Sequence, residues 1–333
     1  MEPVHKIKDN VYKKVFGEPE MIVDFLKDYI PIDIVKNVKP EDIEDITERF
    51  LPLFSDNKDS DTVKKIKLQG DKSLFFIGII EHESEVNFTA SFKLFQYITY
   101  VQSDFVKEND KKHEEEVKKT GRSKIKLSTS KGFKLPPVLP IIFYDGTKKW
   151  TSSLDLLGRT ELAEIFYKYI PKFEYELVDL NQYNWNDLMS FGNLLSFIFM
   201  MDKVHKPEDL ELLSALPKDY LDKLNLNIPD HLLKLAADCI GMLLRKVDIS
   251  KEDVDSITEK IYKRRFVDMF NPQFSVKDIR EEGIKVGIKK GREEGRKESA
   301  IDMARKLLLK GISVKDIVDV TGLNEEFIET LNN

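Results

Sequence analysis

The feature that most constrains the fold is an apolar run, Leu74 to Ile80, that ends abruptly in Glu81-His82-Glu83-Ser84. A run this short and this rich in isoleucine and phenylalanine predicts a buried strand. Side chains alternate along a strand, so we expect Glu81 and Glu83 on one side and His82 on the other. Two carboxylates where a buried strand ends are costly unless something pairs with them, and a divalent metal ion is the usual partner.

A second strand is predicted upstream, over residues 61–68, with Gln69 to Lys72 as the connecting turn. An antiparallel hairpin folded about Gly70–Asp71 sets residue 61 opposite residue 80 or 81. Asp61 is then expected beside Glu81, so that one aspartate and two glutamates converge at the edge of a sheet. A few hard oxygen ligands of this type suit Mg²⁺ or Mn²⁺.

Several short motifs are spread along the chain, each weak alone but specific in combination. They are Asp9-Asn10-Val11-Tyr12-Lys13, Ser60-Asp61, Glu81-His82-Glu83-Ser84, Phe92-Lys93-Leu94-Phe95-Gln96-Tyr97, and Leu135 to Gly146 followed by Trp150. With these motifs the chain resembles the PD-(D/E)XK nucleases. More specifically, it resembles the Rpn group, recombination-promoting nucleases also labelled putative transposases, over roughly residues 5–330.

The resemblance implies an α/β fold with a mixed sheet flanked by helices, a mostly helical C-terminal extension, and Mg²⁺- or Mn²⁺-dependent hydrolysis of DNA. Asp61 and Glu81 would hold the metal, with the backbone carbonyl of His82 beside them. Lys93 or Lys13 would neutralise charge developing on the phosphate. Recombination, mobile elements and phage defence are the contexts that the resemblance implies.

Further residues are expected near this site. Gln96 and Tyr97 lie three and four positions after Lys93, so on a helix the three share one face. Resemblance also makes Asp9 and Lys13 neighbours of the site, although an i,i+4 pair on a helix surface is the simpler interpretation of those two.

The chain departs from the family pattern at two positions. Glu83 stands where the family has glutamine and the superfamily has lysine, so it serves as a third ligand, as part of a second ion site, or as a general base, and these roles stay open. Lys93 stands where the family has arginine, which keeps the charge and loses the bidentate fork.

A second class of function competes with the nuclease hypothesis. The domain could be a catalytically idle nuclease fold that binds DNA or a partner protein, and the change to Glu83 keeps this alternative open. A full transposase is disfavoured, because no convincing recognition helix is found. The helix expected at Glu325 to Leu331 is acidic, which favours a helical cap or protein-docking module over a DNA reader.

Pattern changes along the chain predict two parts: a nuclease-like domain with a helical extension over residues 1–270, and a C-terminal helical tail over residues 276–333. Helices are expected over 9–29 (broken near Gly17), 88–106, 186–264 and 299–331. Strands are expected over 138–144 and 173–177. A mobile charged loop is expected over 107–131.

Glycine recurs every four residues at Gly283, Gly287, Gly291 and Gly295 within a helix-prone segment. Glycine costs up to about 1 kcal/mol inside a helix, so four in register need a reason. A flat stripe of small residues lets another helix approach closely, which predicts a homo-oligomer formed through the C-terminal helices. A weakly ordered tether is the alternative.

Composition sets the outer limits. The chain has 333 residues, a formal net charge of −6 and one cysteine, so no intrachain disulfide can form. The basic residues cluster at 107–131 and 285–310 but are mixed with acids, which is typical of solvated surfaces. No apolar segment is typical of a signal peptide or a membrane span, so we expect a cytoplasmic protein without membrane insertion.

Overall fold

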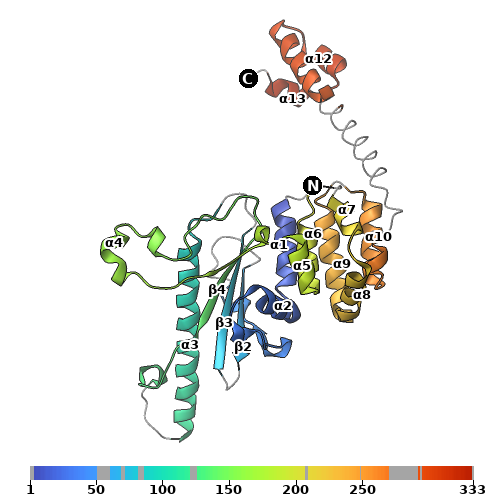
Figure 1. Ribbon diagram of the computed structural model, residues 1–333. Helices are drawn as coiled ribbons and strands as arrows, with labels where there is room; N and C mark the ends of the chain where they lie inside the picture. Colours follow the sequence, from blue (N-terminus) through green and yellow to red (C-terminus); the bar gives the residue numbers. More distant parts are fainter. Residues whose placement is uncertain are drawn as a thin grey trace. The chain divides into compact units, whose positions relative to one another are not determined.

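The computed structural model describes residues 4–50, 61–68, 72–81, 86–120, 126–206, 209–247, 249–269, 292 and 295–331 (Figure 1). The chain folds into two compact units. The first is formed by Met1–Val247 with Lys251–Phe270, and the second by Asp248–Ser250 with Asn271–Asn333. The domain boundary that the sequence predicts, between residues 270 and 276, lies outside the described residues.

The first unit is built on a five-stranded sheet in the order β1-β2-β3-β4-β5. The strands are β1 (Ile43–Asp45), β2 (Thr62–Leu68), β3 (Lys72–Glu81), β4 (Val138–Tyr144) and β5 (Glu176–Asp179). The first three strands pair antiparallel, whereas β3, β4 and β5 run parallel. The predicted mixed α/β architecture is therefore confirmed, as are the predicted strands that correspond to β2, β3 and β4.

The register of the β2–β3 hairpin differs from the prediction by at least one residue. Thr62 pairs with Gly78 and Leu68 with Lys72, so position 61 falls opposite position 79 rather than 80 or 81. The reason is that Lys72 belongs to β3, which leaves three connecting residues instead of a turn centred between residues 70 and 71. Since side chains alternate, this register gives positions 61, 79 and 81 the same side of the sheet.

The outermost strand, β5, also lies later than predicted. It spans Glu176–Asp179, whereas the alternation of Phe173 to Leu177 predicted a strand starting at 173. The side chains of Phe173 and Tyr175 are used for packing, since both belong to the core beneath α3 (Ala90–Thr120). Tyr175 also accepts a hydrogen bond from the indole of Trp150 at 3.0 Å, so this stretch is held by side chains before β5 begins.

Helix α3 connects the parallel strands β3 and β4 and covers one face of the sheet (Figure 1). It continues to Thr120, so the prediction of a mobile loop from residue 107 is wrong for residues 107–120. Glutamate and lysine are good helix formers. Here they also pair one turn apart, with Lys112 Nζ 2.7 Å from Glu108 and Lys118 Nζ 2.9 Å from Glu114.

Helices α1 (Val4–Val15) and α2 (Pro19–Tyr29) cover the other face of the sheet, and the predicted break near Gly17 separates them (Figure 1). The contact is aromatic: the rings of Tyr12 and Phe143 lie 4.9 Å apart, and Phe25 meets Phe76 edge-on at 6.3 Å. On the α3 face, Val63, Ile79 and Ile142 pack against Leu94. The sheet is therefore buried on both faces, as its near-continuous apolar strands require.

The remainder of the first unit is mostly helical, as predicted. The short helix α4 (Ala163–Phe166) lies between β4 and β5. The helices that follow β5 are α5 (Trp185–Phe191), α6 (Leu194–Asp202), α7 (Leu210–Ser214), α8 (Lys218–Asn227), α9 (Asp230–Leu244) and α10 (Lys251–Tyr262). Cys239 is a buried free thiol on α9.

The second unit contains a helix over residues 295–309, then α12 (Val314–Thr321) and α13 (Glu325–Thr330), around a small core of Ala304, Ile317 and Ile328. Gly322 ends α12 with a φ of +67°, a left-handed conformation that glycine adopts without strain. Gly283, Gly287 and Gly291 of the glycine stripe lie outside the described residues. Within the described part of the chain, no helix is both long and apolar enough to cross a membrane.

Candidate active site

Asp61 directly precedes β2 and is almost fully buried, with 2% of its surface exposed. Its Oδ2 accepts hydrogen bonds from Lys93 Nζ at 2.7 Å and from the Tyr97 hydroxyl at 3.4 Å. The side chain of Lys93 keeps 17% of its exposure, so the pair lies where the core meets solvent. A buried carboxylate requires ionic or hydrogen-bonding partners, and α3 supplies both here.

The spacing of residues on α3 explains this arrangement. Lys93 and Tyr97 lie one helical turn apart, and Lys93 Nζ is 5.5 Å from the centre of the Tyr97 ring. The structure thus brings these two predicted residues to Asp61. It leaves Gln96, the third member of the predicted group, exposed on the surface of the helix.

The backbone places the end of β3 close to Asp61. Glu81 is the last residue of β3 and pairs in register with Tyr144 of β4. Ile79 and Tyr144 belong to the core beneath α3. Alternation gives position 81 the same side as Ile79 and therefore as Asp61. Diagonal positions on neighbouring strands are about 7–8 Å apart, so the two backbone positions are near neighbours.

The rest of the predicted metal set is not described. The side chain of Glu81 and the whole of residues 82–85, including His82 and Glu83, lie outside the described residues. Across the side chains that are described, no group of three histidine, cysteine, aspartate or glutamate residues could hold a metal ion. The combined site of Asp61, Glu81, Glu83 and the carbonyl of His82 therefore stays a prediction, with Asp61 as its described member.

Asp9 and Lys13, the predicted site neighbours, lie on α1, which covers the sheet face opposite to α3. Asp9 is half-buried and Lys13 is exposed. Two other side chains of α1, Lys8 and Tyr12, are buried and enter a second polar cluster.

This second cluster, called here the buried ion cluster, consists of Lys8, Tyr12, Asp145, Asp202 and Lys246. Lys8 Nζ lies 2.9 Å from Asp145 Oδ2 and 3.0 Å from Asp202 Oδ2, and Lys246 Nζ lies 2.6 Å from Asp202 Oδ1. The Tyr12 hydroxyl donates to Asp202 Oδ2 at 3.2 Å. The cluster joins α1, the residue after β4, the end of α6 and the segment after α9, so it ties the sheet to the helical extension.

The charges in the buried ion cluster stabilise one another. Burial alone would raise the pKa of Asp202, but Lys246 and Lys8 outweigh it and hold that pKa well below its ordinary value. Burial likewise opposes the charge of Lys8, but Asp202 and Asp145 raise its pKa overall. At Lys246 burial dominates and lowers the pKa. Two lysines thus face two aspartates, and their formal charges balance.

Sequence reasoning did not find this cluster, since it included Asp145 only within the motif from Leu135 to Gly146 and did not single out Lys8, Asp202 or Lys246. One signal was available. Asp202 ends α6, whose other eight residues, LLSFIFMM, are all buried. A charged residue in that position requires a buried partner.

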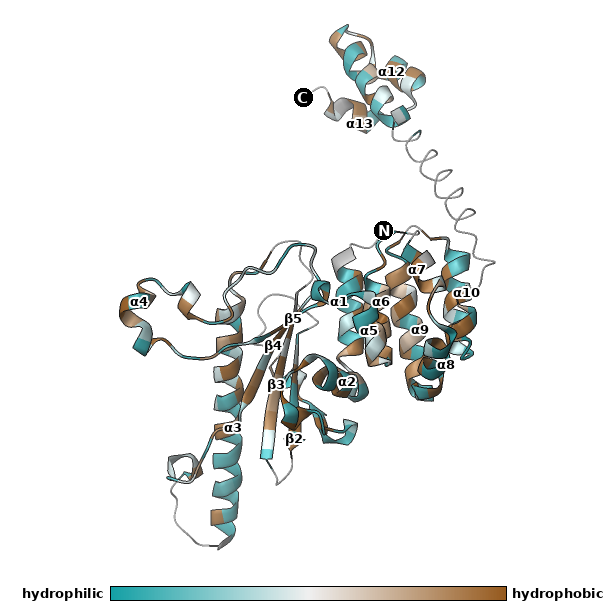
Figure 2. Ribbon diagram, in the orientation of Figure 1, coloured by the Kyte–Doolittle hydropathy of each residue, from teal (hydrophilic) through white to brown (hydrophobic). Residues whose placement is uncertain are grey.

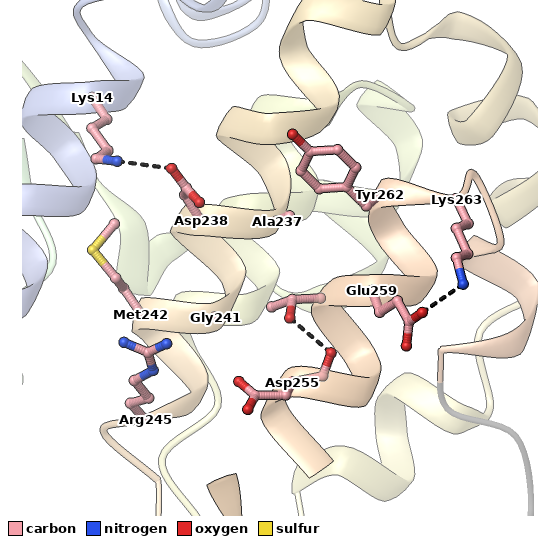
Figure 3. A pocket seen from close by; sticks show the side chains of 11 residues that line it. Lys14, Ala237, Asp238, Gly241, Met242, Arg245, Asp255, Glu259, Tyr262 and Lys263 are labelled. Atoms are coloured by element: carbon pink, nitrogen blue, oxygen red, sulfur yellow. Dashed lines mark hydrogen bonds and ion pairs between the residues drawn. The ribbon is translucent and has the colours of Figure 1, made fainter. Parts of the chain in front are cut away.

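A surface cavity of about 700 Å³ lies between α9 and α10, beside α1 (Figure 3). The two helices pack closely at Gly241, where a Cβ would stand only 2.8 Å from Thr258 Cγ2. Charges of both signs line it, including Lys14, whose Nζ lies 3.0 Å from Asp238. This mixture selects no single class of ligand, and none of the predicted site residues is among its lining.

The donor chemistry at Asp61 fits a hard divalent cation. Carboxylate oxygens are the ligands that Mg²⁺ and Mn²⁺ prefer, and Asp61 is held rigidly by α3. Both contacts described above fall on Oδ2, so Lys93 would share or release that oxygen when a cation binds. Asp61 thus supplies a ligand atom of the right type, and the geometry of a complete cation site depends on residues beyond Asp61.

Comparison with known proteins supplies a family. A family model described as "Putative transposase, YhgA-like" matches residues 6–227. The match runs from α1 to the end of α8 and includes the sheet, α3 and Asp61. No curated protein and no solved structure matches the chain.

Proposed function

Because the chain belongs to the YhgA-like putative transposase family, the Rpn family of PD-(D/E)XK nucleases, we propose that it is a metal-dependent DNA endonuclease. Family membership supports nuclease- or transposase-related activity. The observation that carries the finer proposal is Asp61, a buried carboxylate held by Lys93 and Tyr97 on the sheet face where β3 ends in Glu81.

In the proposed site, Asp61, Glu81, Glu83 and the backbone carbonyl of His82 hold Mg²⁺ or Mn²⁺. Such an ion, when bound, neutralises charge on a phosphate oxygen and lowers the pKa of a water molecule. Glu83 orients or deprotonates that water, or completes a second ion site. One or two ions are compatible with three carboxylates.

Two residues of α3 support the reaction from the helix side. Tyr97 donates to Oδ2 of Asp61 at 3.4 Å, which helps to hold the carboxylate in place. Lys93 places its ammonium 2.7 Å from the same oxygen, so a phosphate bound next to Asp61 meets a positive charge within reach. Positive groups aimed at developing phosphate charge stabilise the transition state.

The alternative function is a catalytically idle nuclease fold that binds DNA or protein. Glu83 keeps this alternative open, because it departs from the glutamine that the family has at this position. DNA as partner, a cytoplasmic location and self-association through the C-terminal helices belong to the proposal as well, the last resting on a glycine stripe of which only Gly295 is described.

The test is plasmid nicking by the purified full chain with Mg²⁺, with Mn²⁺ and with EDTA. We expect metal-dependent nicking by the wild type and a loss of at least about 100-fold in Asp61→Asn, because the variant keeps the shape and removes the charge that binds the ion. Wild-type protein that shifts DNA in a gel but never nicks it with either metal would select the binding module.

A matched control is available in the same sheet. Asp45 pairs with Lys64 at 2.6 Å, across β1 and β2, in another short aspartate–lysine contact. Lys64 lies at an even position of β2 and therefore on the opposite side of the sheet from Asp61. Asp45→Asn is expected to nick like the wild type. Equal losses in Asp45→Asn and Asp61→Asn would mean that the sheet, and not a site, had been damaged.

A further inference from the structure

The segment between β4 and β5 exposes an unusual number of large apolar side chains. Tyr169 is 71% exposed and Tyr167 is 55% exposed, and the segment also exposes Leu157, Leu162, Ile165 and Phe166. Figure 2 shows hydrophobic residues on α4, which projects outward from the first unit. Exposed apolar groups gathered in this way mark a binding surface more often than scattered single residues do.

This segment is anchored to the start of α3, next to the candidate active site. The guanidinium of Arg159 lies 5.9 Å from the centre of the Phe88 ring, and Phe173 stacks on Phe95 at 5.8 Å. Phe92, the residue before Lys93, is itself 54% exposed. The segment that carries the exposed tyrosines is thus joined to the start of α3, whose first turns bear Phe92 and Lys93.

Each of the two exposed tyrosines carries a cation on its ring. Lys168 Nζ lies 5.0 Å from the centre of Tyr169, and Lys172 Nζ lies 5.7 Å from the centre of Tyr167. The stretch from Ile165 to Phe173, which lies between Glu164 and Glu174, contains these two lysines and no acidic residue. Positive charges interleaved with exposed rings suit a single nucleic acid strand, because the charges can contact its phosphates and the rings can stack on its unpaired bases.

We propose that this surface, called here the stacking surface (Phe92, Tyr167, Tyr169, Lys168 and Lys172), binds single-stranded DNA and leads it to Asp61. Tyr167 and Tyr169 stack on unpaired bases, and the two lysines contact the phosphates. The inference rests on the proposed function for its choice of DNA as the ligand. It adds a preference for unpaired strands, since paired bases have no free faces to stack.

The experiment measures binding of a fluorescein-labelled 20-nucleotide oligo(dT) and of a 20-base-pair duplex by anisotropy, with the full chain in EDTA. We expect tighter binding of the single strand. Tyr167→Ala and Tyr169→Ala should each weaken single-strand binding about tenfold, and Tyr169→Trp should retain it, because stacking requires a ring. Tyr262→Ala is the matched control, since Tyr262 on α10 is also 55% exposed.

Three outcomes overturn the inference: equal affinity for single strand and duplex, unchanged affinity in both tyrosine-to-alanine variants, or an equal loss in Tyr262→Ala. A change of sedimentation coefficient in Tyr169→Ala with unchanged DNA affinity also overturns it and assigns the surface to a protein contact. Because EDTA prevents metal-dependent cutting, binding is scored separately from nicking. A protein that binds through these tyrosines but never nicks retains this inference and loses the proposed nuclease.

Discussion

Two polar clusters lie at the same end of one sheet, on opposite faces, and they differ in how their charges are balanced. In the buried ion cluster, Asp145 and Asp202 are matched by Lys8 and Lys246, and all four side chains are at most 8% exposed. On the other face, Asp61 contacts a lysine that reaches solvent, and the neighbouring strand ends in Glu81. A balanced, enclosed network holds elements together, whereas a carboxylate whose lysine partner can turn toward solvent can exchange that partner for a cation.

The comparison predicts opposite consequences for two similar substitutions. Asp202→Asn should lower the free energy of unfolding by about 3–5 kcal/mol, because it leaves two buried lysines facing one aspartate. Asp61→Asn should cost much less, since Lys93 can turn toward water. Urea unfolding at pH 7, followed by circular dichroism, measures both values.

The same pair of variants also tests whether the two clusters have separate roles. Nicking activity per folded molecule should survive in Asp202→Asn under conditions where the variant is folded, and should be lost in Asp61→Asn. If Asp202→Asn also abolishes nicking while folded, the two clusters act as one site. The division into a structural role for the buried ion cluster and a reactive role for Asp61 and Lys93 is then wrong.

A second prediction concerns Lys93, the lysine that contacts Asp61. Lys93→Met should lower the nicking rate about 100-fold, because it removes the positive charge next to the carboxylate that we expect to bind the ion. Lys93→Arg should retain part of the rate, since arginine keeps the charge and binds phosphate. Initial rates at saturating Mg²⁺ measure the effect.

Lys64→Met is the control for this lysine, because Lys64 is equally bound to an aspartate but lies on the other face. It is expected to leave the nicking rate close to that of the wild type, once the fraction of folded protein is equalised. Similar losses in Lys93→Met and Lys64→Met would remove Lys93 from the proposed mechanism.

The smallest predicted effect is the pH dependence of the stability that Asp202 contributes. Burial raises the pKa of Asp202, but the lowering of this pKa by Lys246 and Lys8 is larger. The pKa of Asp202 in the folded protein therefore lies below its unfolded value of about 4. Such a group contributes stability above pH 4 and loses that contribution as the pH falls. The stability difference between wild type and Asp202→Asn should therefore be full at pH 7 and smaller at pH 3. A difference that does not change with pH contradicts the ionised form of Asp202.

Local patterns were enough to predict much of the fold. The run from Leu74 to Ile80 predicted β3, because buried parallel strands are continuously apolar. The hairpin register was off because the hydrophobic pattern does not encode whether Lys72 belongs to the turn or the strand. Residues 107–120 were mistaken for a loop since a sequence rich in lysine and glutamate is compatible with both an exposed helix and a disordered segment.

The candidate site was predictable to the extent that its residues are adjacent to regular elements. Asp61 was predicted from the hairpin beside Glu81, Lys93 from the resemblance to the nuclease family, and the structure brings the two to 2.7 Å. The buried ion cluster was not found, because Asp202 is 194 positions from Lys8 and 44 positions from Lys246, and the three meet only when the helical extension packs on α1. No local periodicity contains that information.

The central claim, that Asp61 belongs to a metal site, is tested most directly by titrating Mn²⁺ into the full chain in a calorimeter without DNA. Wild type and Asp45→Asn should bind Mn²⁺ with the same affinity, and Asp61→Asn should bind it at least about tenfold more weakly, since carboxylate oxygens are the ligands that Mn²⁺ prefers. Equal Mn²⁺ affinity in all three proteins would contradict the claim.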